Sequence, residues 1–131
     1  MEKSIAKGTF EVKMNPQSQE QIGLHTMGRY LLDKQFSGDL EAISTVEMLA
    51  AGTENGAGAY VAIERVTGKL NGREGTFILT HMGTRTKTSQ ELRVIVVPGC
   101  GTGDLSGLTG TMEIIIENKV HYYVFTYQIA N

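Results

Sequence analysis

Residues 97–112 read VPGCGTGDLSGLTGTM, a glycine-rich crossing between two runs of strand-like sequence. Residues 103–105 of this stretch are Gly, a charged residue and Leu, and the same pattern occurs at residues 38–40 and 68–70. Each copy stands where one apolar run ends and the next begins. Because glycine adopts the backbone conformations that tight turns require, we interpret the copies as turns that join successive strands of a meander. We therefore look for chemistry on the strands rather than in the glycines.

Length and composition predict a single domain covering residues 1–131, because 131 residues is close to the commonest domain size and can bury a full core. The chain has 16 glycines but only two prolines and no low-complexity run. Such an excess of glycine is typical of many short strands joined by turns and bulges, rather than of disorder.

Charge and cysteine content limit the partners and the compartment. Twelve basic and 14 acidic residues give a net charge of −2, and no basic block is present that could bind a row of phosphates. We therefore expect no nucleic-acid partner. No apolar run approaches the roughly 18 to 20 residues of a membrane-spanning helix, so we expect no membrane association. The single Cys100 cannot form an internal disulfide, and the first residues lack the apolar core of a signal peptide, which predicts the cytoplasm.

Alternation of apolar and polar residues runs through almost the whole chain and begins with residues 6–14. This period of two is typical of half-buried strands. The polar residues 15–20, which include Pro16, are expected to separate the first strand from the second. Residues 40–50 also fit a helical spacing, but their β-branched residues favour a strand. We count about eight strands and no helix.

Eight short antiparallel strands are compatible with a sandwich or with an up-and-down barrel. The connections are nearly all short enough for hairpins, which favours a meander. A meander of eight strands can close without leaving unpaired edges, and its interior can be filled by side chains or can hold one small ligand. The predicted fold is all-β, a single closed antiparallel barrel of about eight strands in mostly up-and-down order.

Four runs of the chain, residues 7–12, 36–41, 63–72 and 97–105, resemble a family of small bacterial proteins, domain of unknown function 3224. The resemblance covers nearly the whole chain. It implies an allene oxide cyclase-like barrel, a fold shared with plant allene oxide cyclases and related in architecture to dirigent proteins. It implies no established activity, and fold alone transfers no catalytic residue.

Polar residues that point into the barrel are the candidates for chemistry. Glu64 shares a strand face with Tyr60, where apolar surroundings would raise its pKa and suit a general acid or base; the alternative is an ion pair with an arginine that fixes strand register. His81 lies at one mouth of the lumen or is a hydrogen-bonded core histidine. Glu47 comes close to Glu64 in register, and whether both face inward is left open. Arg93 is either the counter-ion of an inward acid or a charge on the outer face, and we favour the outer face.

Aromatic residues alternate along the last strand at Tyr123, Phe125 and Tyr127, and Phe77 lies on the same strand face as His81. They line a cavity if the lumen is open, or they form ordinary core. Cys100 has no histidine near it in sequence that could activate the thiol.

No cofactor or metal is expected. The three histidines, His25, His81 and His121, do not have the spacing of metal ligands. The glycines near Cys100 are not followed by the Gly-Lys-Ser or Gly-Lys-Thr ending and helix of a phosphate-binding loop.

Two functions of different classes remain, together with a structural alternative. The first is binding of a small apolar or amphipathic molecule in the lumen. The second is a cyclase- or isomerase-like enzyme in which Glu64, with His81 or Tyr60, acts on an intermediate in the same lumen. The alternative is a packed lumen with an outer surface that forms a homo-oligomer, to which the apolar strand at residues 92–97 would contribute in any case. The residues expected to bind a ligand are Glu47, Tyr60, Glu64, Phe77, His81, Tyr123, Phe125 and Tyr127.

Overall fold

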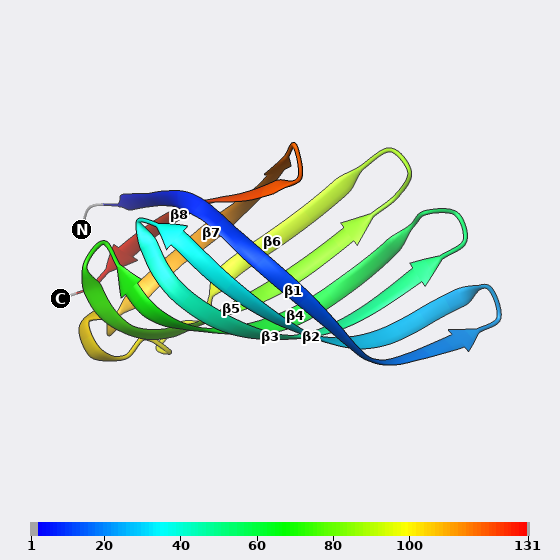
Figure 1. Cartoon of the computed structure of the whole chain (residues 1–131), viewed down its shortest axis with the longest axis horizontal. Coiled ribbons are helices and arrows are strands. Elements are labelled where there is room, and N and C mark those ends of the chain that lie inside the picture. The colour runs from blue at the N-terminus through cyan, green and yellow to red at the C-terminus, as the bar shows by residue number, and fades with distance from the viewer. Residues whose placement is uncertain (1–2, 131) are drawn as a thin grey trace.

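The computed structural model describes residues 3–130, which form eight antiparallel strands and a single turn of 3₁₀ helix. Each strand pairs with the next, and β8 pairs back with β1, so the sheet closes into a barrel (Figure 1). This confirms the predicted all-β, up-and-down barrel. The elements are β1 (Ser4–Ile22), β2 (His25–Gly38), β3 (Leu40–Thr53), β4 (Gly58–Leu70), β5 (Arg73–Arg85), β6 (Gln90–Val96), η1 (Gly103–Leu105), β7 (Leu108–Glu117) and β8 (Val120–Ile129).

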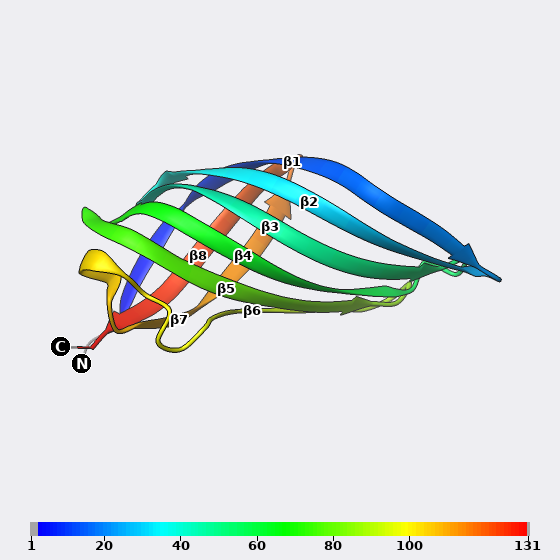
Figure 2. The same cartoon turned by 90° about the horizontal axis from the view of Figure 1, so that it is seen from below.

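The barrel is longer on one side than on the other. The hairpins β1–β2, β3–β4 and β5–β6 project beyond β7 and β8, as Figures 1 and 2 show. Strand β1 pairs with β8 only from Ser4 to Phe10, although it pairs with β2 as far as Ile22. The inner face of the projecting hairpins is therefore not covered by an opposite wall. We call this end of the barrel the open end, and the end that carries both chain termini the closed end.

Strand β1 continues through the polar residues 15–20, so the prediction that they separate two strands is wrong. Pro16 pairs with Tyr30, and the register shifts between Pro16 and Ser18. Beyond Phe10, β1 has a neighbour on one side only, so the missing N–H of a proline disrupts no second ladder there. The strand β2 is likewise unbroken at Gly28.

The closed end contains the hydrophobic core. The rings of Phe77 and Phe125 are stacked with their centroids 5.7 Å apart, and both side chains are buried. The hydroxyl of Tyr123 accepts a hydrogen bond from the Leu40 amide and donates to the Ser37 carbonyl, each at 2.9 Å, which ties β8 to the turn between β2 and β3. The lumen is packed solid at this level.

The glycine-rich segment 97–107 closes this end of the barrel. Leu105 of η1 is completely buried, and the Thr102 amide donates to the Thr76 carbonyl at 2.9 Å. Gly38 and Gly103, the first residues of two of the repeated patterns, have φ angles of 107° and 60°, a region that favours glycine. The repeats at these two positions are thus turns, as predicted, and they serve the closure of the barrel. Residues 68–70, in contrast, belong to β4 and pair with both β3 and β5, so the prediction of a turn there is wrong; the turn follows at Asn71 and Gly72. Nowhere in residues 3–130 is a helix long and apolar enough to cross a bilayer.

Candidate functional site

A cluster of four polar side chains is buried in the lumen between the core and the open end. Lys34 of β2 faces Ser44 of β3, Val46 of β3 faces Glu64 of β4, and Ala62 faces His81 of β5. Because inward positions alternate along each strand, this register places the four polar residues on three successive inward rows across four neighbouring strands. We call Lys34, Ser44, Glu64 and His81 the Glu64 cluster.

Both carboxylate oxygens of Glu64 are occupied. Oε1 lies 2.7 Å from Nε2 of His81 and 3.2 Å from Nζ of Lys34, and Oε2 accepts a hydrogen bond from the Ser44 hydroxyl at 2.6 Å. Glu64 is 0% exposed. The Lys34 ammonium also lies 4.7 Å from the centroid of the Phe10 ring, within range of a cation–π contact. The cluster therefore links four strands through one buried anion.

The pKa of Glu64 is lowered although the residue is buried. Burial acts to raise the pKa, but the hydrogen bond from His81, the positive charge of Lys34 and the hydrogen bond from Ser44 together outweigh it. Glu64 is therefore an ionised acceptor, and His81 Nε2 must donate its proton to it. This is the opposite of the raised pKa that the apolar neighbours in the sequence suggested, and the partner is a lysine instead of an arginine.

Two other charged candidates lie on the outer face. The Glu47 side chain is 71% exposed and lies 3.9 Å from Arg29 in a surface ion pair. Glu47 and Glu64 therefore do not form a pair of lumenal carboxylates. Arg93 pairs with Met82 on the outer face and is exposed, as we favoured.

A cavity of about 540 Å³ opens above the Glu64 cluster at the open end. We call it the mouth cavity. Its lining includes the apolar Met14, Pro16, Met48, Ala50 and Leu92, the tyrosines Tyr30 and Tyr60, and the polar Gln19, Arg85 and Gln90. Met14 is 51% exposed, so the cavity is open to solvent along the side that β7 and β8 do not cover. Glu64 is not among the residues that line the cavity.

Two glycines make room for the tyrosines of this cavity. A Cβ atom on Gly83 of β5 would lie 2.6 Å from Cε1 of Tyr60, and one on Gly28 of β2 would lie 2.6 Å from the Tyr30 hydroxyl. The two tyrosine side chains therefore lie so close to these glycines that a larger residue at either position would have to displace them. Ala50 lies between Tyr60 and Gly28 in the same row of the sheet.

Tyr60 connects the mouth cavity to the buried cluster. Its ring centroid lies 6.4 Å from that of His81. The pKa of Tyr60 is raised, first by burial and then by the negative charge of Glu64, so its hydroxyl remains a neutral donor. Of the residues predicted to bind a ligand, Tyr60 lines the cavity, while Glu64 and His81 lie beneath it.

The remaining predicted lining residues, Phe77, Tyr123, Phe125 and Tyr127, belong to the packed core of the closed end. Sequence reasoning missed Lys34 and Ser44 in the cluster and Tyr30 in the cavity. All three stand at inward positions of alternating strands, so the signal was present in the strand β2 for Lys34 and Tyr30. A lysine on an apolar face was the clearest indication of a buried anion nearby.

Neither the cysteine nor the histidines form a metal site in the part of the chain that the structure describes, where no three metal-ligating side chains come together. The Cys100 sulfur accepts a hydrogen bond from the Ile78 amide at 3.0 Å, which holds the glycine-rich segment against β5. The His121 ring packs 5.1 Å from that of Phe10.

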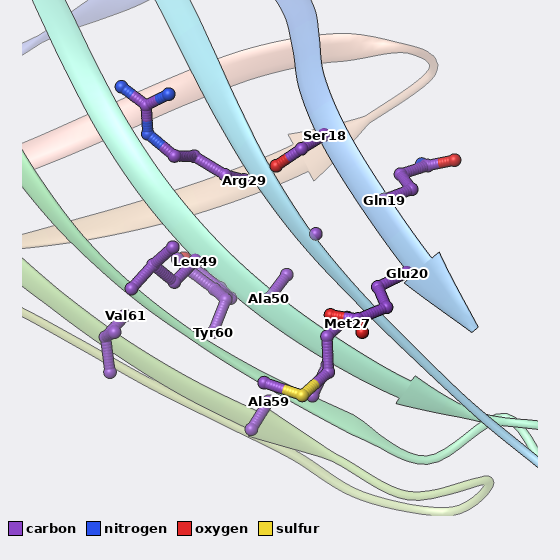
Figure 3. A pocket seen from close by; sticks show the side chains of 12 residues that line it. Ser18, Gln19, Glu20, Met27, Arg29, Leu49, Ala50, Ala59, Tyr60 and Val61 are labelled. Atoms are coloured by element: carbon purple, nitrogen blue, oxygen red, sulfur yellow. The ribbon is translucent and has the colours of Figure 1, made fainter. Parts of the chain in front are cut away.

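The outer face of β2–β5 carries exposed apolar side chains beside a shallow hollow of about 670 Å³ (Figure 3). Leu49 pairs with Val61, and Val61 pairs with Met82, so these three side chains lie in one row across neighbouring strands. They are 57%, 49% and 60% exposed. Together with Met27 and Ile63, which are also exposed, they form what we call the apolar outer face.

Comparison with known proteins identifies the family. No curated protein is significantly similar to this chain. The crystal structure of a protein of unknown function from the DUF3224 family of Shewanella oneidensis MR-1 is similar, with 45% sequence identity and a TM-score of 0.93 over 99% of this chain and 100% of that one. The family model for DUF3224, described as a protein of unknown function, matches residues 6–127. The chain therefore belongs to the DUF3224 family.

Proposed function

We propose that the protein binds a small amphipathic molecule in the mouth cavity. The observation that carries this proposal is an open cavity of about 540 Å³ with an apolar floor and polar groups at its rim. Pockets for small ligands begin at about 300 Å³ and combine apolar walls with a few placed polar groups. The packed core leaves no room for a ligand at the level of Phe77 and Phe125.

The rigidity of the cavity floor supports binding. Tyr60 lies over Gly83 on one side and packs near His81 below, and His81 is held by Glu64. A side chain held in place before the ligand arrives loses little entropy on binding, which favours affinity. In this account the Glu64 cluster supports the floor and does not touch the ligand.

The alternative is a cyclase- or isomerase-like enzyme that uses an inward carboxylate. Glu64 is ionised, completely buried and bonded through both oxygens, and it does not line the cavity. A general base must come within hydrogen-bonding reach of the proton that it removes. This arrangement favours binding over carboxylate catalysis.

Fluorescence titration with N-phenyl-1-naphthylamine, a neutral apolar probe, tests the proposal. Ala50 faces the cavity, whereas Leu49, the preceding residue of β3, is exposed on the outer face and does not line the cavity. We expect Ala50→Phe to fill the cavity and weaken binding of the probe by about tenfold or more, and Leu49→Phe to leave the probe's affinity within about twofold. Absence of probe binding to the native protein, or a loss caused only by Leu49→Phe, would refute the proposal.

We also propose that the apolar outer face is a contact between copies of this chain. Arg29 and Glu47, which have opposite charges, border its apolar rows. In two copies related by two-fold symmetry, Arg29 of one copy can therefore meet Glu47 of the other. In the strand β6, which the sequence suggested for this role, Val94 and Val96 point into the core.

The mass of the protein in solution, measured by light scattering, tests this contact. We expect Val61→Lys to convert the native oligomer to a monomer, because it places a charge at the centre of the apolar outer face. Ile5→Lys replaces an exposed apolar residue on the outer side of β1 and is expected to leave the mass in solution unchanged. A native protein that is already a monomer would contradict the contact.

A cytoplasmic location is proposed on the basis of Cys100. Its thiol is half-buried, hydrogen-bonded to Ile78 and unpaired, which suits a reducing compartment. In intact cells we expect a membrane-permeant alkylating reagent to modify Cys100 and an impermeant reagent to leave it unmodified. Modification by the impermeant reagent would contradict this location.

A further inference from the structure

Arg85 is the last residue of β5 and lines the mouth cavity. It pairs with Gly58 of β4 and with Gln90 of β6, neither of which is charged. His81 and Gly83 precede it at alternate positions on the inner face, so the register directs the Arg85 side chain inward as well. A guanidinium group thus stands at the edge of a cavity whose lining also includes the apolar Met14, Met48 and Leu92.

Within residues 3–130, no carboxylate lies within 4.0 Å of Arg85, since the ion pairs are those of Arg29 with Glu47 and of Glu64 with Lys34 and His81. Glu91 also borders the cavity, but it pairs with Thr84 and therefore belongs to the outer face of the sheet. Among the described lining residues, Arg85 is the one charged group that the register directs into the cavity. An arginine with a fixed planar fork is well suited to bind an oxyanion through two parallel hydrogen bonds.

The other polar groups of the cavity also offer donors. The Tyr30 hydroxyl accepts a hydrogen bond from Gln19 Nε2 at 2.9 Å, which leaves its own O–H to donate. The Tyr60 hydroxyl makes no hydrogen bond to the described residues and stays protonated because burial and the charge of Glu64 raise its pKa. A ligand that satisfies these groups must bring acceptors.

We propose that the molecule bound in the mouth cavity is an organic anion, in which a carboxylate or sulfonate pairs with Arg85 and an apolar body lies against Met48, Ala50 and Tyr60. This inference rests on the proposed binding function and adds the charge of the ligand. It also gives Arg85 a partner, which the described residues 3–130 do not supply.

The experiment compares two probes with one scaffold. N-phenyl-1-naphthylamine is neutral, and 8-anilinonaphthalene-1-sulfonate is the same anilinonaphthalene with an added sulfonate. Both are titrated by fluorescence into the native protein, into Arg85→Gln and into Arg93→Gln, a matched control because Arg93 is exposed on the outer face of β6. We expect Arg85→Gln to lower the affinity for the sulfonate probe by about fivefold to tenfold and to leave the affinity for the neutral probe within about twofold of the native value. Arg93→Gln is expected to alter neither affinity. High salt is expected to lower only the affinity for the sulfonate probe.

The outcomes separate this inference from the proposed function. Equal affinities of the sulfonate probe for the native protein and for Arg85→Gln, while the neutral probe binds, would overturn the pairing with Arg85 and leave the binding function intact. Equal losses in Arg85→Gln and Arg93→Gln would show a general effect of charge and would also overturn it. Failure of both probes to bind the native protein would refute the binding function and the inference together.

Discussion

Nε2 of His81 lies 2.7 Å from Oε1 of Glu64, and the same oxygen is 3.2 Å from Nζ of Lys34. One buried carboxylate oxygen thus receives two donors from two different strands, while Ser44 donates to the other oxygen. The contact fixes the His81 ring beneath Tyr60 and so links the stability of the barrel to the floor of the mouth cavity.

Replacing Glu64 by glutamine should destabilise the protein strongly. The change removes the negative charge and leaves Lys34 as a buried cation without a counter-ion, which costs about 3 to 5 kcal/mol of unfolding free energy. Urea denaturation measures this loss. Glu47→Gln is the matched control, because Glu47 is exposed and its ion pair with Arg29 contributes about 1 kcal/mol or less. Equal effects of the two substitutions would contradict the structural role of the cluster.

Acid should remove the contribution of Glu64. The folded state holds the pKa of Glu64 below its ordinary value, so the unfolded chain takes up the proton first as the pH falls. The stabilisation is therefore complete above the unfolded-state pKa, about 4.3, and is lost as the pH falls from there through the lowered folded-state pKa. We expect the unfolding free energy of the native protein to fall more steeply over this acid range than that of Glu64→Gln. Parallel pH profiles would show that Glu64 is not stabilised as an anion.

The Tyr123 hydroxyl should contribute to closure of the barrel. Tyr123→Phe leaves the buried Leu40 amide without its acceptor and removes the donor to the Ser37 carbonyl, which costs about 1 to 3 kcal/mol. Thermal or urea unfolding detects this change. Tyr122→Phe, on the exposed side of the same strand, should cost less than about 0.5 kcal/mol, so a comparable loss there would argue against a specific role for Tyr123.

Gly83→Ala should disturb the cavity floor more than the fold. The new methyl group would lie 2.6 Å from Cε1 of Tyr60 and must displace the ring, so we expect N-phenyl-1-naphthylamine to bind about tenfold more weakly. Gly52→Ala is the control, because a Cβ atom there meets only the Ala57 carbonyl oxygen at 4.0 Å. Unchanged probe affinity in Gly83→Ala would remove Tyr60 from the binding surface.

The barrel was predictable from the sequence because its signals are local. Alternation marks the strands, and Asn71-Gly72 marks a tight turn whose φ angles are 48° and 83°. The prediction for the polar residues 15–20 is wrong because this part of β1 has a neighbouring strand on one side only, where polar side chains and Pro16 are tolerated.

The candidate site was only partly predictable, because it depends on how the strands are aligned. Glu64 and His81 were identified as inward candidates, but the side on which Glu47 lies follows from a register that alternation alone does not fix. The sign of the Glu64 pKa shift depended on Lys34, which is 30 residues away in the chain. The cavity could not be predicted without knowing that three hairpins project beyond β7 and β8 and that β1 stops pairing with β8 after Phe10.

The methionine side chains offer the most direct test of ligand binding in the mouth cavity. Met14 and Met48 line the cavity, Met27 and Met82 lie on the apolar outer face, and Met112 is in the core. With methyl-labelled methionine, NMR spectra are recorded as N-phenyl-1-naphthylamine is added. The account predicts shifts of the Met14 and Met48 methyl signals while those of Met27 and Met82 remain in place. Shifts confined to Met27 and Met82 would place the ligand on the outer face and contradict it.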